Sequence, residues 1–149
     1  MNDAGANTPK DKIVDINLND LRYMLDLNCV SAVGMIQEIY PCMAEKQSGL
    51  IVKILSICCF FNNPLAGNYS ASKDAMEGIS KILIKKAKKD HIGVCSGYPW
   101  GVNMRFRAVA NRNYLKPETV ANMIKACIEN EEGWVHHIVI RPFIGDNMP

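Results

Sequence analysis

The chain of 149 residues lacks long apolar runs and lacks a strong excess of either charge. Even the apolar run 57–61 stops at Asn62, far short of the roughly 18 residues that span a bilayer. Its 17 basic and 15 acidic side chains give a net charge of +2, too little for the concentrated basic face that binds nucleic acid. We therefore expect no membrane or nucleic-acid partner, and a small molecule as the ligand.

A secretory signal is also missing, because the first residues carry neither a basic stretch nor an apolar core. We expect a cytoplasmic protein whose six cysteines remain thiols. No pair has C-x-x-C spacing, and the adjacent Cys58 and Cys59 cannot hold zinc alone, so buried small apolar side chains are the simpler interpretation. His136 and His137 lie on a predicted strand, where they face opposite ways, and we predict no metal site.

No repeat or linker divides the sequence, which predicts one domain over 1–149. The apolar residues predict strands over 49–57, 91–96 and 136–140, and helices over 19–46, about 69–89 and from Pro117 to near Asn130. Pro41 predicts a kink or a tightened last turn in the first helical region. Strands that alternate with helices at this spacing indicate an α/β fold with a mostly parallel sheet.

Tyr69 and Lys73 stand four residues apart at the start of a predicted helix, so their side chains project from one face about one turn, roughly 5.4 Å, apart. A tyrosine hydroxyl has a pKa of about 10, and a nearby ammonium favours the phenolate, which suits proton transfer near neutrality. Such pairs also arise by chance on helix surfaces. Ser56 adds a hydroxyl thirteen residues before Tyr69, near the carboxyl end of a strand, where ligands of open α/β sheets bind.

The active-site segment of the short-chain dehydrogenase/reductase family is closely similar to two stretches here, Ile54-Leu55-Ser56 and Asn68-Tyr69-Ser70-Ala71-Ser72-Lys73. The resemblance implies an oxidoreductase that interconverts a small-molecule carbonyl and an alcohol, with NADP or NAD as cofactor. It implies that Ser56 orients the carbonyl and that Tyr69 passes the proton. It also implies that Lys73 lowers the tyrosine pKa while holding the nicotinamide ribose.

Two further segments resemble the family. Asn2-Asp3-Ala4-Gly5 is similar to its N-N-A-G turn after the fourth strand, and Pro99-Trp100-Gly101-Val102-Asn103-Met104 stands where the family has P-G-x-V-x-T against the nicotinamide. Asn28 resembles the family's fourth catalytic residue, which orders a proton-relay water, although a helical asparagine can also bond the preceding turn. The resemblance thus implies the catalytic residues Asn28, Ser56, Tyr69 and Lys73, and the cofactor-binding residues Asn2, Ala4, Gly5, Tyr69, Lys73, Pro99 and Val102.

The family's glycine-rich turn, T-G-x-x-x-G-x-G, which meets the cofactor pyrophosphate, is missing. The ten glycines include no G-x-G pair, and the sequence starts where the family's fourth strand has already ended. We therefore expect an N-terminally truncated family member: a partial Rossmann-like, doubly wound parallel sheet with flanking helices, in which only the catalytic half is present. Trp100 and Met104 also depart from the nicotinamide-binding pattern.

Two hypotheses about function remain open at this stage. The chain is either an NAD(P)-dependent oxidoreductase or a truncated, non-catalytic relative that acts as a dimerising interaction protein. The helices at 19–46 and 69–89 resemble those that pair across the family's dimer interface, so we expect a homo-oligomer in either case. Arg105 and Arg107, in a loop at the family's substrate lid, meet an acidic substrate or are simply solvated.

Overall fold

The computed structural model describes residues 1, 5–6, 12–61, 63–103 and 111–143. Three parallel strands form one sheet in the order β1-β2-β3, namely β1 (Gly49–Ile54), β2 (Ile92–Pro99) and β3 (His137–Ile140). The helices are α1 (Leu18–Leu25), α2 (Ser31–Lys46), α3 (Gly67–Ala87) and α4 (Pro117–Ile128). Short helical turns complete the chain at η1 (Ile13–Asp15), η2 (Asp26–Val30), η3 (Ile57–Cys59) and η4 (Lys88–Asp90).

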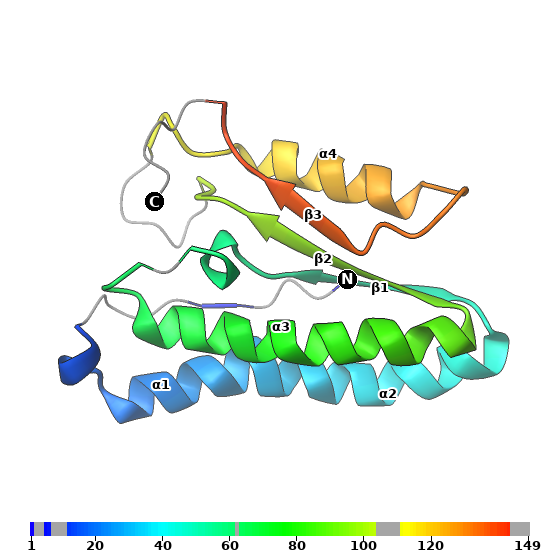
Figure 1. The fold of residues 1–149 in the computed structure, drawn as a ribbon, viewed down its shortest axis with the longest axis horizontal. Helices are drawn as coiled ribbons and strands as arrows, with labels where there is room; N and C mark the ends of the chain where they lie inside the picture. The colour runs from blue at the N-terminus through cyan, green and yellow to red at the C-terminus, as the bar shows by residue number, and fades with distance from the viewer. Residues whose placement is uncertain (2–4, 7–11, 62, 104–110, 144–149) are drawn as a thin grey trace.

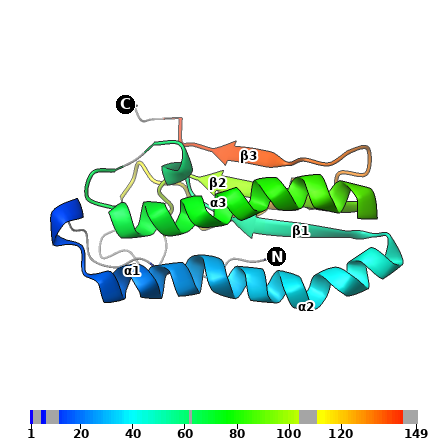
Figure 2. The same ribbon diagram turned by 60° about the horizontal axis from the view of Figure 1, so that its bottom comes forward.

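Each pair of neighbouring strands is joined by a helix that returns the chain to the start of the sheet (Figure 1). β1 runs beside β2 with Gly49 opposite Ile92, and β2 runs beside β3 with Ser96 opposite His137. α1 and α2 follow one another alongside α3 on one face of the sheet, as the turned view shows (Figure 2). The predicted α/β class, a partial Rossmann-like parallel sheet with flanking helices, is confirmed.

Two apolar cores lie on opposite faces of the sheet because side chains alternate along a strand. On one face, Ile51 packs with Ile92 and Val94 against α2 and α3. On the other, Val52 packs with Cys95 against Ile124 of α4. Since both faces of β1 and β2 are covered, these strands read in the sequence as almost continuous apolar runs.

The first helical region consists of two helices, and Pro41 does not mark the division between them. Pro41 lies inside α2, which continues to Lys46 and ends with Gln47 in the left-handed conformation. The irregularity is η2, a π-helical turn between α1 and α2. This turn is where Asn28 becomes buried, and π-turns inside helices occur mostly at functional positions. The kink or tightened last turn at Pro41 stays a prediction, and the region consists of two helices that meet at η2.

Strand boundaries shift for local reasons. β1 stops at Ile54 rather than at residue 57, because the Ser56 side chain accepts a hydrogen bond from the Cys58 backbone and starts η3. β2 extends to Pro99, past the predicted end at residue 96, because β3 supplies pairing partners up to that position. Among the helices built from described residues, none combines the length and the apolar character that a bilayer crossing requires.

A buried polar cluster lies between β1, β2 and α3. The Tyr98 hydroxyl donates to Glu77 Oε2 at 2.7 Å, and the Lys53 side chain, 2% exposed, lies in the same layer with no hydrogen-bond partner in the described part of the chain. Burial lowers the pKa of Lys53 to about 8, and the negative charge of Glu77 only partly offsets this. Lys53 is therefore a charged group that folding removes from water at a cost in free energy.

Replacing the buried Ile92 with alanine should lower the free energy of unfolding by about 2 to 5 kcal/mol, because it leaves a cavity in the core beneath α3. The matched control is Ile82→Ala on α3, whose side chain is 68% exposed and should change stability by less than about 0.5 kcal/mol. Urea denaturation followed by circular dichroism measures both values. Equal losses at the two positions would contradict the described core.

Lys53 should make stability depend on pH between about 8 and 10.5. The folded chain releases this proton near pH 8 and the unfolded chain near 10.5, so between these values the unfolded state binds more protons and stability rises with pH. The stability difference between wild type and Lys53→Met should therefore move in favour of wild type by about 2 to 3 kcal/mol across this window. Urea titrations at pH 7.5 and 10.5 measure it, with Lys85→Met on α3 as the control for a lost charge. A flat difference would show that Lys53 is not desolvated.

Candidate active site

Ser56 lies at the carboxyl end of β1, two residues beyond the strand. Its side chain is largely buried, and its Oγ accepts a hydrogen bond from the Cys58 backbone N–H at 3.3 Å. The turn η3, which this contact starts, packs against α3. The Ser56 hydroxyl is thereby fixed at the edge of the sheet beside the helix that carries Tyr69 and Lys73.

Tyr69 and Lys73 lie in the first turns of α3, as the sequence predicted. Tyr69 is half-buried, whereas Lys73 is buried, and the Lys73 Nζ lies 5.7 Å from the centre of the Tyr69 ring. The same ammonium donates to the carbonyl oxygen of Ile54 at 3.1 Å. Lys73 therefore links the tyrosine to the last residue of β1.

Asn28 joins three segments that are far apart in the sequence. Its Oδ1 accepts from the Ala6 N–H at 3.1 Å, and its Nδ2 donates to the Ala6 carbonyl at 3.3 Å and to Ser72 Oγ at 2.9 Å. Ser72 in turn donates to the Tyr69 carbonyl at 2.8 Å. The π-turn η2 thus fixes both the N-terminal segment and the start of α3.

Gly5 lies against this network. A Cβ atom at this position would stand 3.1 Å from Asn28 Oδ1 and 3.4 Å from Lys73 Nζ, so a side chain here would crowd both polar groups. The structure therefore brings together Gly5, Asn28, Tyr69 and Lys73, with Ser56 on the adjoining turn. Asn2 and Ala4, which the sequence also assigned to the cofactor, lie outside the described residues.

Pro99 and Val102 lie in a different environment. Both line a cavity of about 410 Å³ that is also bounded by Ile54 and by α4 residues such as Val120 and Ile124. Ile54 lies between this cavity and the Tyr69–Lys73 region. Its carbonyl oxygen accepts a hydrogen bond from Lys73, and the residue also lines the cavity. Residues 104–110, with Met104, Arg105 and Arg107, are outside the described part of the chain.

Two features of the region could not be predicted from the sequence pattern. The hydrogen bond with Cys59, together with contacts to Ser56 and Ser70, lowers the pKa of the Cys58 thiol despite its burial. Arg141, directly after β3, lies over the rings of Trp100 and Phe61. Spacing could not reveal this contact, because the three residues belong to three separate segments.

Comparison with known proteins identifies the family. Residues 1–115 match the family model of the short chain dehydrogenases, and the chain belongs to this family. An uncharacterized oxidoreductase of Staphylococcus aureus (strain MW2) is 30% identical over 135 residues, which is 88% of this chain and 58% of the relative. The chain thus spans somewhat more than half the length of the curated relatives it matches.

Solved structures share the fold at lower identity. An alcohol dehydrogenase of Thermococcus sibiricus, complexed with 5-hydroxy-NADP, superimposes with a TM-score of 0.87 at 14% identity, covering 98% of this chain and 63% of that one. The serine dehydrogenase of Escherichia coli gives a TM-score of 0.85 at 20% identity, covering 97% and 63%. These structures confirm the predicted Rossmann-like fold, while the family model confirms the predicted membership of the short-chain dehydrogenase/reductases.

Replacing Asn28 with alanine should destabilise the chain by about 1 to 3 kcal/mol, because three hydrogen bonds are lost and buried groups of Ala6 and Ser72 lose a partner. Asn122→Ala, at an exposed position of α4, is the matched control and should stay within about 0.5 kcal/mol of wild type. Hydrogen exchange gives a second measurement, in which the Ala6 amide loses protection in Asn28→Ala. An unchanged Ala6 exchange rate would contradict the bridging role of Asn28.

Proposed function

We propose that this chain provides the catalytic half of an NAD(P)-dependent oxidoreductase that interconverts a carbonyl and an alcohol on a small molecule. The proposal rests above all on the Lys73 ammonium, which lies beside the Tyr69 ring and is held by the end of β1. A phenol beside a buried ammonium is suited to exchange a proton with a substrate oxygen. Family membership supports an oxidoreductase in general terms.

Each site residue has a proposed role. In the direction of reduction, the Tyr69 hydroxyl donates its proton to the carbonyl oxygen as the alcohol forms, and Lys73 stabilises the phenolate that remains. Ser56 donates a hydrogen bond to the same oxygen and holds it in place. Asn28 keeps the start of α3 in position through its hydrogen bond to Ser72, which donates to the Tyr69 carbonyl. On its other side, Asn28 is hydrogen-bonded to the backbone of Ala6.

The residues present fit the nicotinamide end of the cofactor. Gly5 leaves space beside Lys73 Nζ and Asn28 Oδ1 that a Cβ would fill, and a ribose hydroxyl would find a donor in Lys73. Pro99 and Val102, together with Asn2, Ala4 and Gly5, are the proposed contacts of the nicotinamide half. When bound, the nicotinamide supplies or accepts the hydride. The sequence printed above offers no glycine-rich turn for the pyrophosphate.

The names of similar proteins suggest the kind of substrate and cofactor. Structures that share this fold are titled alcohol dehydrogenase with 5-hydroxy-NADP, serine dehydrogenase, and 4-hydroxyisoleucine dehydrogenase with NADH and succinate. We propose a small hydroxylated substrate and either NADP or NAD for this chain, acting in the cytoplasm.

A second candidate function is a non-catalytic, dimerising interaction protein. It is favoured by the apolar side chains that α2, α3 and the preceding turn leave exposed, with exposed fractions of 38 to 68% at Val30, Met35, Ile39, Ile79 and Ile82. Exposed apolar patches of this kind often mark association surfaces. Sedimentation measures the association, and NADPH fluorescence distinguishes the candidates, since only the enzyme requires micromolar binding.

Tyr69→Phe should abolish turnover while leaving nicotinamide binding unchanged, because it removes the proton donor and keeps the ring. We expect a loss of at least about a hundredfold in kcat, the ordinary contribution of a positioned acid. NADPH oxidation at 340 nm with a panel of small ketones measures turnover, and fluorescence titration measures binding. Tyr23→Phe, at an exposed position of α1, is the control.

The assignment of Tyr69 fails if the phenylalanine variant turns over as fast as wild type. The oxidoreductase proposal fails for these 149 residues if wild type shows no NADPH binding in the micromolar range. The dimerising candidate is then supported if the chain sediments as a dimer that Ile82→Asp dissociates.

A further inference from the structure

Arg141 has an environment that the proposed chemistry does not require. Its guanidinium carbon lies 4.9 Å from the centre of the Trp100 ring and 5.6 Å from that of Phe61. The three residues come from different segments, since Phe61 follows η3, Trp100 follows β2 and Arg141 follows β3. Their contact assembles a half-buried cation and two aromatic rings at one end of the sheet.

These aromatic contacts do not use the hydrogen-bonding capacity of Arg141, and no described residue accepts a hydrogen bond from it. Stacking on a ring satisfies the charge in part, but it satisfies none of the five N–H donors of the guanidinium. No carboxylate of the described residues forms an ion pair with Arg141, since the pairs formed there involve lysines only. Among the described residues, the side chain is thus held by two rings, and no hydrogen bond or ion pair occupies its donors.

The register of the sheet puts this cation near Ser56. Ile54 lies opposite Gly97, and Pro99 lies opposite Ile140. The Leu55 N–H still donates to the Gly97 carbonyl beyond the end of β1, so continuing this register places Ser56 level with Pro99 and Ile140. Because neighbouring strands are about 4.8 Å apart, the backbones of Ser56 and Ile140 are roughly 10 Å apart. Arg141 is one residue beyond this row, and the Trp100 N–H donates to the Ile140 carbonyl at 2.8 Å.

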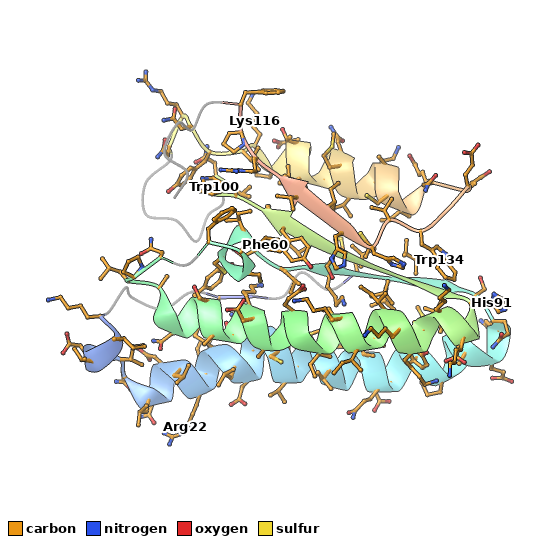
Figure 3. The ribbon with its side chains drawn as sticks, viewed as in Figure 1. Arg22, Phe60, His91, Trp100, Lys116 and Trp134 are labelled. Carbon is orange, nitrogen blue, oxygen red and sulfur yellow. The ribbon has the colours of Figure 1, made fainter. Side chains whose placement is uncertain are left out.

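Figure 3 shows Trp100 and Phe60 together at the carboxyl end of the sheet, while His91 marks the opposite end of β2. The ring of Phe60 in turn packs on that of Tyr98, with centres 4.7 Å apart. The cation thus lies on Trp100 and Phe61 at the end of the sheet that also carries Ser56, and these rings exclude part of the water around it, which strengthens a charged contact.

We propose that Arg141 binds a carboxylate of the substrate, so that the substrates are oxo acids and hydroxy acids with a few carbons between the carboxylate and the reacting carbon. The inference rests on the proposed function, in which Ser56 and Tyr69 hold the reacting oxygen. A planar guanidinium matches a carboxylate with two parallel hydrogen bonds, which a neutral ester cannot accept with equal strength. Trp100 and Phe61 are positioning residues, because their rings fix the plane of the Arg141 guanidinium.

The test compares 4-oxopentanoate with its methyl ester, which has the same ketone and the same chain but no charge. Saturation-transfer NMR titrations on the full 149-residue chain give both dissociation constants without any need for turnover. We expect the acid to bind at least tenfold more tightly than the ester. If wild type binds the acid and the ester with equal affinity, the proposal is overturned.

Substitutions of Arg141 test whether this residue causes the preference for the acid over the ester. Arg141→Gln should weaken acid binding at least tenfold and remove the preference over the ester, whereas Arg141→Lys should retain a reduced preference because it keeps the charge and loses the fork. Arg22→Gln, on α1 at the far side of the molecule, should leave both affinities unchanged (Figure 3). Melting curves establish that each variant is folded. An acid preference that survives in folded Arg141→Gln places the anion elsewhere and overturns the proposal.

This experiment separates the inference from the proposed function. If the acid binds through Arg141 and no NADPH is oxidised, the anion site is supported and the oxidoreductase proposal fails. If NADPH oxidation with neutral ketones depends on Tyr69 but acids gain nothing from Arg141, the oxidoreductase proposal is supported and the carboxylate inference fails.

Discussion

The buried ammonium of Lys73 needs an oxygen acceptor, and that requirement ties the start of α3 to the end of β1. Lys73 meets it by donating to the carbonyl oxygen of Ile54, an atom at the last position of the strand. The contact fixes the height of α3 along the sheet and therefore the position of Tyr69. Asn28 acts on the same helix from the other side, through Ser72. The first turns of α3 are thus held by two contacts, one from Lys73 to β1 and one from Ser72 to Asn28.

The elements themselves could be predicted well, because both faces of the sheet are covered and each helix carries a buried stripe. Their ends could not. Ser56 starts a helical turn with its own side chain, and the pairing of β3 carries β2 on to Pro99, so both boundaries depend on contacts outside the local pattern. The π-turn could not be predicted either, since the apolar pattern of five residues does not distinguish a turn with i→i+5 hydrogen bonds from an ordinary α-helical turn.

The site shows the same division. Tyr69 and Lys73 were predictable because helical spacing alone puts both on one face. The bridge from Asn28 to Ala6 spans 22 residues, and only the folded chain reveals it. The stack of Arg141 on Trp100 depends on strand order, which periodicity does not encode. Residues that act alone or within one turn are readable from sequence, whereas residues that act across segments require the fold.

The π-turn η2 has a consequence for comparing this chain with its relatives. A π-turn accommodates one residue more than an α-helical turn, so the loss of a single position within Asp26–Val30 would convert η2 into an ordinary α-helical turn and remove the bulge that carries Asn28. Asn28 would then leave the interior, although every other amino acid stayed the same. Alignments that slide a gap through this segment would pair Asn28 with the wrong residue, so homologous positions here are best matched by superposing backbones.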